Sequence, residues 1–268
     1  MFEKNLFEKF IAWINGKVDS EKEKEYIGRI KYIIIAGDIV DGIGQYPQQE
    51  KELDIKDVYK QYEKAAKYFE KIPDYIKLIV IPGNHDATRK TLPQPAISKK
   101  FANPIYEHPN LISLGNPAQI KLHKVNILIH HGQSLEDPLA VTPNINHHNV
   151  TVAMAYFLKA RHLAPVYGAK TPLAPEPKDW MIVESVPDVY HSGHIHVFGY
   201  SAYRNVKLVN SGCWQKQTTY QQKMGITPTY AVVPILNLQS NKLDIMDFNA
   251  MTFSSQTPLT LGRSNGLF

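Results

Sequence analysis

Four clusters of carboxylate, amide and imidazole side chains stand in this sequence, and each directly follows a short apolar run. Oxygen and nitrogen donors of this kind suit divalent ions such as Mn, Fe and Zn, and no thiolate accompanies them. Two such ions about 3.5–4 Å apart clamp a phosphate and activate a water, so the chemistry indicated is hydrolysis of a phosphoester. The clusters are Gly37-Asp38-Ile39-Val40-Asp41, Gly83-Asn84-His85-Asp86, His130-His131-Gly132 and Gly193-His194-Ile195-His196.

Each cluster taken alone has an ordinary explanation, because Gly-Asp and Gly-Asn are common turn pairs and most histidines are surface or core residues. The Gly-Asn-His-Asp string by itself is suggestive but short. It follows Gly-Asp-x-x-Asp and precedes Gly-His-x-His along one chain. This order favours one composite site over coincidence.

The apolar runs before the clusters have the length of buried strands. Strands and helices alternate early in the chain and strands crowd together late, which predicts a layered α/β sandwich. Functional loops of open α/β sheets gather beyond the strands, where all four clusters lie. We expect strands at 32–35, 78–81, 125–129, 189–191, 206–209, 230–238 and 243–248, and helices at 6–14, 58–72 and 152–160.

The domain organisation is simple. A chain of 268 residues with 43% hydrophobic content can bury one sizeable core, and we expect one domain over residues 1–248. The charged stretch 19–25 is interpreted as a solvated linker. Residues 249–268 are rich in Ser, Thr and Asn without periodicity, and we expect a disordered tail there.

Charge and cysteine content narrow the classes of protein. Lys and Arg outnumber Asp and Glu by 30 to 25, a net charge of +5 that is compatible with a polyanionic partner but is weak evidence alone. Cys213 is the only cysteine, so no intrachain disulfide is possible and we expect a reducing, intracellular compartment. No apolar run approaches the length of a membrane span.

The four clusters resemble those of the calcineurin-like metallophosphoesterases, the superfamily that includes Mre11-type nucleases. The resemblance implies two β-sheets flanked by helices and two divalent ions, with Mn as our choice and Fe, Zn or Mg as alternatives. Asp38 looks like the ligand that bridges the ions. Asn84, His131 and His194 look like the other ligands of one ion, and His196 looks like a ligand of the second.

The same resemblance assigns the residues around the scissile phosphate. His85 matches the histidine that contacts the phosphate and protonates the leaving group, Asp86 would orient it, and Asp41 matches a supporting carboxylate. Spacing alone does not choose between His130 and His131 as the ligand. We choose His131, because it directly precedes Gly132 as in the family pattern.

The stretches between the clusters are similar to the small subunit of the archaeal family D DNA polymerases. This similarity extends over roughly residues 6–248 and involves loops that the superfamily does not share. The matching segments are Gly44-Gln45-Tyr46-Pro47, Ile81 to Arg89 running into Leu92-Pro93-Gln94-Pro95, Arg161 to Pro165, Val186-Pro187-Asp188, Leu208 to Ser211 and Trp214-Gln215.

This resemblance implies a 3′→5′ exonuclease that proofreads for a separate large polymerase subunit in the archaeal cytoplasm, close to the nucleoid. The substrate implied is a single-stranded or mismatched 3′ end of DNA. Arg89, Arg161 and His162 become candidates for contact with the DNA backbone, against the alternative of ordinary loop salt bridges.

The sequence departs from the pattern in one respect. Active members of the superfamily begin with a strand that ends in Asp-x-His, and no Asp-x-His occurs here. We interpret the chain as a fragment that starts just after this strand, and expect a gap in the sheet and weak binding of one metal. Such a chain is expected to be inactive alone.

Two other functions remain open at this stage. One is a scaffold subunit that keeps the fold without chemistry. The other is a phosphatase acting on small monoesters, although Gly42 stands where the protein phosphatases of the superfamily have arginine.

Overall fold

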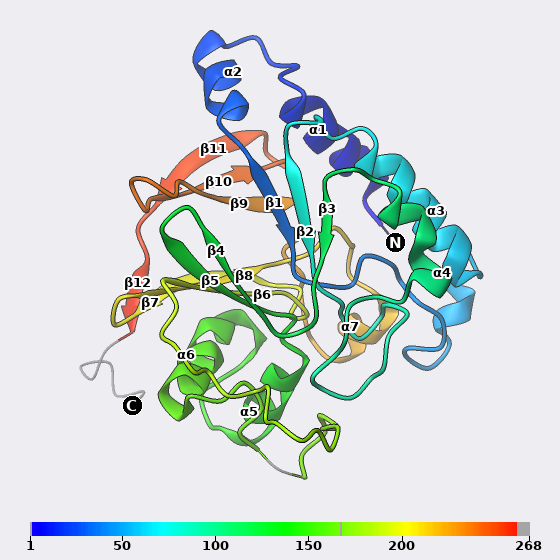
Figure 1. The fold of residues 1–268 in the computed structure, drawn as a ribbon, viewed down its shortest axis with the longest axis vertical. Coiled ribbons are helices and arrows are strands. Elements are labelled where there is room, and N and C mark those ends of the chain that lie inside the picture. The colour runs from blue at the N-terminus through cyan, green and yellow to red at the C-terminus, as the bar shows by residue number, and fades with distance from the viewer. Residues whose placement is uncertain (1, 167, 262–268) are drawn as a thin grey trace.

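The computed structural model of the chain describes residues 2–166 and 168–261. Figure 1 shows strands through the middle of the molecule, with α1, α3 and α4 along one side and α5 and α6 below. This arrangement confirms the predicted α/β sandwich. In the described part of the chain, no helix has the length and apolar character needed to cross a membrane.

The helices cover the outer faces of the strands. Asp57 caps α3, since its side chain accepts a hydrogen bond from the backbone N–H of Lys60, and Gly16 takes a positive φ just beyond α1. The helices are α1 (Lys4–Ile14), α2 (Glu21–Gly28), α3 (Val58–Phe69), α4 (Lys99–Tyr106), α5 (Glu136–Val141), α6 (Val150–Ala160) and α7 (Thr219–Lys223), with short 3-10 turns η1 (Gln49–Lys51), η2 (Gln133–Leu135) and η3 (His147–Asn149).

The strands form three sheets in place of the two that we expected. Their orders are β1-β2-β3, β11-β10-β9 and β12-β7-β8-β6-β5-β4. The strands are β1 (Tyr32–Ile35), β2 (Lys77–Val80), β3 (Leu111–Ser113), β4 (Ala118–Leu122), β5 (Val125–His130), β6 (Val189–Ser192), β7 (Phe198–Tyr203), β8 (Val206–Ser211), β9 (Val232–Leu236), β10 (Leu243–Asp247), β11 (Thr252–Gln256) and β12 (Leu259–Leu261).

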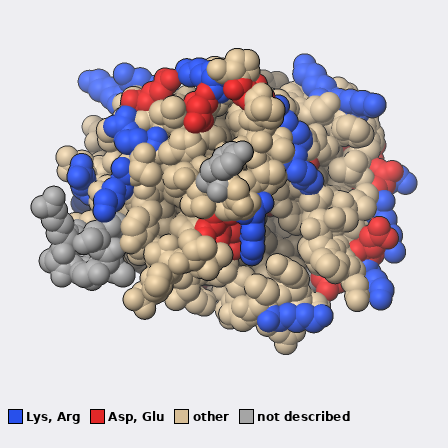
Figure 2. Space-filling view, turned by 90° about the horizontal axis from the view of Figure 1, so that it is seen from below, with Lys and Arg blue, Asp and Glu red and all other residues tan. Residues whose placement is uncertain are grey.

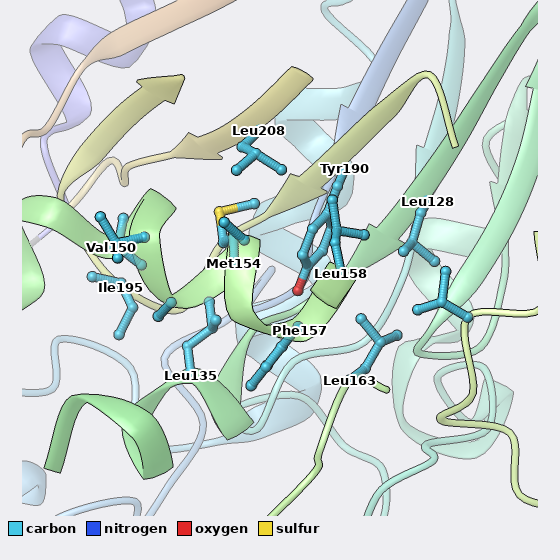
Figure 3. Close-up of a cluster of buried hydrophobic side chains, with 14 of the residues drawn as sticks. Leu128, Leu135, Val150, Met154, Phe157, Leu158, Leu163, Tyr190, Ile195 and Leu208 are labelled. Atoms are coloured by element: carbon cyan, nitrogen blue, oxygen red, sulfur yellow. The ribbon is translucent and has the colours of Figure 1, made fainter. Parts of the chain in front are cut away.

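Apolar burial joins these layers. The six-stranded sheet packs against α6, whose Met154, Phe157 and Leu158 meet Tyr190 and Leu208 from the strands (Figure 3). A second core lies under α1 and α3, where Trp13 and Tyr62 are almost fully buried. Burial on this scale stabilises the fold by roughly 1.5–3 kcal/mol for each large apolar side chain.

A groove of about 1240 Å³ separates the first two sheets. β1 pairs with β2, β9 pairs with β10, and in residues 2–166 and 168–261 the other edge of each has no strand partner. Both strands line the groove and all of their residues are only half-buried, including the apolar Ile33 and Ile35 of β1. This open edge agrees with the gap that we expected in the sheet.

Two sequence-based expectations were wrong. Residues 19–25 were taken as a linker, but residues 21–25 belong to α2, because Ser20 caps this helix and Glu21 and Glu23 occupy its first turn. Residues 252–261, taken as a disordered tail, form β11 and β12, and residues 262–268 lie outside the described part. β11 is exposed along its whole length and is held by backbone pairing with β10, so it has no apolar pattern.

Candidate metal centre

The register of the parallel strands brings the four clusters together. In the β1–β2 pair, Ile35 lies opposite Val80, so the first two clusters leave the sheet side by side. In the β5–β6 pair, His130 lies opposite Ser192, so the third and fourth clusters also leave their sheet side by side. The carboxyl ends of both pairs therefore supply one site.

Four predicted ligands converge there. The ligand atoms of Asp38, His131 and His194 all lie within 4.8 Å of one another. His131 Nε2 is 3.3 Å from Asp38 Oδ2 and 3.0 Å from Asn84 Oδ1, and His194 Nδ1 is 2.9 Å from that same Asn84 oxygen. Two ring nitrogens and two oxygens that face one point form a donor set suited to a divalent ion.

Glycines allow this convergence. A Cβ on Gly83 would lie 2.6 Å from Cε1 of His131 and would overlap the carboxylate of Asp38. The backbone after β2 can therefore approach the loop after β1 only if this residue lacks a side chain. Asp38 and His194 themselves have positive φ values of 55° and 60°, a sparsely populated conformation that often marks functional loops.

The two adjacent histidines point in opposite directions. His131 Nδ1–H donates to the carbonyl oxygen of Ala36 at 2.6 Å, which leaves the lone pair of Nε2 facing the centre. His130 points into the core, with Nδ1 3.1 Å from the hydroxyl of Tyr190, and burial lowers its pKa to about 3. His130 is the last residue of β5 and His131 follows it, so their side chains leave the backbone on opposite sides. The choice of His131 as the ligand stays a prediction, and its ring is the one that lies 3.0 Å from Asn84 Oδ1.

The Asp38 carboxylate draws positive charge into the centre. Burial lowers the pKa of His131, but Asp38 outweighs it and raises that pKa, so a bound cation would take the place of this proton. Burial opposes ionisation of Asp38, but His131, His85 and His194 outweigh it and hold the pKa of its carboxyl well below the usual range. Burial, followed by repulsion from His131, lowers the pKa of His194 to about 3, so its ring is neutral at pH 7. An ionised carboxylate and a neutral imidazole are the protonation states that metal binding requires.

His85 is oriented by backbone rather than by a carboxylate. Its Nδ1–H donates to the carbonyl oxygen of Asp41 at 2.7 Å, and its backbone N–H donates to Asp38 Oδ1 at 2.8 Å. The carbonyl is fixed in turn by Gln49, whose Nε2 donates to it at 2.8 Å. The Asp41 carboxylate accepts from Gln215 Nε2 at 3.0 Å, so Asp41 supports His85 through its main chain.

Asp86, which we expected to orient His85, instead ties two loops together. Its buried carboxylate accepts hydrogen bonds from the backbone N–H groups of Gly83 at 2.9 Å and Ile39 at 3.2 Å, and from the hydroxyl of Tyr62 at 2.9 Å. Burial, reinforced by Asp38, raises the pKa of Asp86 to about 6. Asp86 therefore holds the Asp38 and Asn84 loops in register.

His196 stands apart from the other ligands. Gln221 Nε2 donates to its Nδ1 at 2.7 Å, and burial lowers the pKa of its ring to about 4. It lines the groove together with Asp38 and His85. In the part of the chain that the structure describes, His196 does not belong to the group of close ligand atoms.

The three candidates for DNA contact already have partners within the chain. Arg89 pairs with Glu176 at 2.6 Å, and Arg161 donates to the carbonyl oxygens of Val183 and Glu184 at 2.7 and 2.6 Å. His162 Nε2 lies 3.0 Å from Asp179. These contacts match the alternative interpretation as loop-stabilising pairs.

Several supporting residues were not foreseen. Asn116 Oδ1 accepts from the backbone N–H of His131 at 3.0 Å, and Gln94 contacts Asn116 at 2.7 Å. Glu136 lies behind His194, 3.9 Å from its Nε2. Amide side chains in loops carry no sequence signal of their own, whereas Glu136, four residues after Gly132, could have been noticed as a carboxylate near the third cluster.

An α/β sandwich that gathers an aspartate, an asparagine and two histidines beyond its strands is the arrangement that the resemblance to the calcineurin-like metallophosphoesterases implies. The family itself is shown by sequence, because residues 3–198 match the model of a family described as the B subunits of DNA polymerases alpha and epsilon. The chain belongs to this family.

Curated relatives of this chain are small subunits of DNA polymerase II. The DNA polymerase II small subunit of Pyrococcus furiosus is 45% identical over 249 residues, which are 92% of this chain and 41% of that protein. The one from Methanothermobacter thermautotrophicus is 45% identical over 242 residues, 90% of this chain and 50% of that protein. This agrees with the predicted resemblance, and the chain spans about two fifths to one half of these relatives.

Among solved structures, a double mutant of Vps29 from Entamoeba histolytica aligns with a TM-score of 0.40 and 11% sequence identity. The alignment covers 91% of this chain and 81% of the Vps29 chain.

Proposed function

We propose that this chain carries the phosphodiesterase centre of a DNA polymerase small subunit and, when its metal site is complete, removes nucleotides from a 3′ end of DNA. The observation that carries the proposal is the convergence of Asp38, Asn84, His131 and His194 on one point, with His85 beside them. Its products would be a nucleotide and a shortened strand with a new 3′ hydroxyl.

The donor set fits a divalent ion, because its oxygens and ring nitrogens face each other at 2.9–3.3 Å while the second nitrogen of His131 is held by a backbone carbonyl. A bound ion would polarise the phosphate and make water a stronger nucleophile at neutral pH. Mn is our choice, with Fe, Zn or Mg as alternatives.

His85 would act on the leaving group. With Nδ1–H donated to the Asp41 carbonyl, Nε2 is the ring atom that can give a proton to the departing 3′ oxygen. Fixing the ring in this orientation lowers the entropic cost of reaching the transition state. His85 is thus the candidate general acid.

A second ion would use Asp38 and His196 from this chain, which are too few donors for tight binding. We therefore propose that two-metal catalysis needs ligands supplied by an additional strand. The open groove beside β1, which Asp38 and His196 both line, supports this proposal.

The substrate and partner follow from the relatives, which are named as small subunits of DNA polymerase II. We propose a large catalytic polymerase subunit as the partner, single-stranded or mismatched DNA as the substrate, and the archaeal cytoplasm as the compartment. Figure 2 shows basic and acidic side chains interspersed on one face rather than gathered in a basic stripe. Substrate recognition would then depend on contacts near the centre.

The incomplete set of ligands for a second ion also favours one rival, a scaffold subunit without chemistry. An assay of Mn²⁺-dependent hydrolysis would compare single-stranded DNA with a chromogenic phosphomonoester, using the chain extended upstream through an Asp-x-His strand. Preference for DNA, lost in His131→Ala, is the expected result. Turnover of the monoester alone would indicate a phosphatase, and turnover of neither would favour the scaffold.

A further inference from the structure

Two tyrosines from distant parts of the chain stack beside the candidate centre. Tyr46 lies in the loop after the first cluster, and Tyr220 lies in α7. Their ring centroids are 5.8 Å apart and their planes are inclined by 29°. Tyr46 is half-buried, whereas 48% of Tyr220 is exposed, so one ring supports another that faces solvent.

Each ring is one residue from a side chain that is linked to a predicted ligand, directly in the case of Gln221 and through Lys90 in the case of Gln45. On one side, Gln221 follows Tyr220 and donates to Nδ1 of His196 at 2.7 Å. On the other side, Gln45 precedes Tyr46 and accepts a hydrogen bond from Nζ of Lys90, which also donates to the carbonyl oxygen of Asn84. The pair therefore lies beside the predicted ligands, with a lysine between it and the Asn84 loop.

Both loops are braced, so the rings are held in place before any ligand arrives. The hydroxyl of Tyr46 donates to Glu52 at 3.1 Å. α7 begins with a reciprocal capping box, in which Thr218 and Gln221 bond each other's backbone N–H groups at 3.1 and 3.0 Å. A preorganised surface loses less entropy when it binds a ligand.

We propose that Tyr220, supported by Tyr46, is a stacking platform for a nucleobase of single-stranded DNA whose phosphate enters the candidate metal centre. The inference rests on the proposed function and names a subsite for it. Aromatic rings stack on every base, which suits an enzyme that acts on any sequence. The two rings are at the separation of one direct aromatic pair, so the base stacks on the solvent side of Tyr220.

Lys90 strengthens the assignment. Its ammonium group has three N–H donors, and two of them are used by Gln45 and Asn84. A phosphate between the platform and the centre would meet this positive charge. Tyr220 would thus bind the base of a nucleotide while Lys90 binds its phosphate.

The test measures binding of a labelled oligothymidylate by fluorescence anisotropy, with a chelator present so that no metal contributes. The comparison probe is a sugar-phosphate backbone of the same length that lacks bases. Tyr220→Ala is expected to weaken binding of the oligothymidylate about tenfold and to leave binding of the baseless strand unchanged. Tyr220→Phe, which keeps the ring, is expected to retain most of the affinity.

Tyr75→Ala is the matched control. Tyr75 is 45% exposed and precedes β2, at the opposite end of the strand from the centre, so its loss is expected to leave binding unchanged. Equal affinity of wild type and Tyr220→Ala for the oligothymidylate would overturn the platform. Equal losses of affinity for both probes would also overturn it, because they would indicate a general disturbance of α7.

The same variants separate the platform from the proposed function. If wild type and Tyr220→Ala bind the oligothymidylate with equal affinity and the chain degrades DNA in the presence of Mn²⁺, the platform is rejected and the nuclease is kept. A base-dependent loss of affinity in Tyr220→Ala, without degradation of DNA by any form of the chain, would keep the platform and reject the nuclease.

Discussion

At the residue scale, the function of the candidate centre depends on which nitrogen of each histidine faces inward. His131 presents Nε2 because Ala36 holds its Nδ1–H, and His130 turns into the core. In the proposed two-ion centre, only the second ion depends on ligands from an added Asp-x-His strand. The first ion therefore provides the most direct test of individual side chains.

We expect His131→Ala to weaken Mn²⁺ binding by at least tenfold, because it removes one of four converging donors, the imidazole whose Nε2 lies 3.3 Å from Asp38. Isothermal titration with Mn²⁺ measures the effect. His130→Ala is the control and is expected to lower the free energy of unfolding while leaving Mn²⁺ affinity near that of wild type. Loss of Mn²⁺ binding in His130→Ala but not in His131→Ala would reverse the assignment.

A second prediction concerns pH. Burial lowers the pKa of His191 to about 4, whereas an unfolded histidine titrates near 6.5. As the pH falls from about 6.5 to 4, the unfolded chain takes up a proton that the folded chain does not, so stability decreases in this window. The contribution is on the order of 1–3 kcal/mol for this one residue.

Urea unfolding of the metal-free protein across that pH range measures the slope. His191→Leu is expected to reduce the slope whatever its effect on absolute stability, since it removes the titrating group. An unchanged slope in this variant would show that His191 does not contribute to the dependence.

The residues of the centre could be predicted because each cluster is local in sequence and the donor types are few. The residues that contact and orient them could not be predicted. Tyr62 meets Asp86 across 24 residues, and Asn116 meets His131 through an amide that has no motif. Such contacts depend on how loops fold back, which no spacing rule encodes.

At the element scale, strands with apolar runs were predicted closely, and polar elements were not. β1 matches its expected range because Tyr32–Ile35 is a continuous apolar run. α2 and β11 were missed because α2 is stabilised by a cap and charges, and β11 mainly by backbone pairing with β10, with a ring contact from Phe253 to Tyr26. Periodicity detects burial, and neither element is buried along its length.

The open edge of β1 leads to the third prediction. Extending the chain upstream by a strand that ends in Asp-x-His should fill the groove between β1 and β9, raise the midpoint of thermal unfolding and tighten Mn²⁺ binding. Calorimetry and Mn²⁺ titration measure both effects.

A control extension would carry proline at the centre of the added strand, because proline cannot donate to a neighbouring strand. This variant is expected to lose the stabilisation. If the two extensions behave alike, or neither differs from the present chain, a paired strand does not occupy the groove.

At the scale of the whole molecule, the sandwich and the family were predictable from ordered motifs and loop segments. The division into three sheets was not predictable, because it follows from the edge of β1, which pairs with no further strand among residues 2–166 and 168–261, and no local pattern marks such an edge. The chain spans about two fifths to one half of the length of its curated relatives. We propose the nuclease activity for a metal centre that an additional strand completes.

The most direct test of that activity is Mn²⁺-dependent degradation of 3′-labelled single-stranded DNA by the present chain and by the extended chain, each with and without His85→Ala. We predict degradation by the extended chain, and its loss on substitution of His85 while Mn²⁺ binding persists. Absence of degradation in both forms, with the protein folded and Mn²⁺ bound, would contradict the proposal and favour a scaffold subunit.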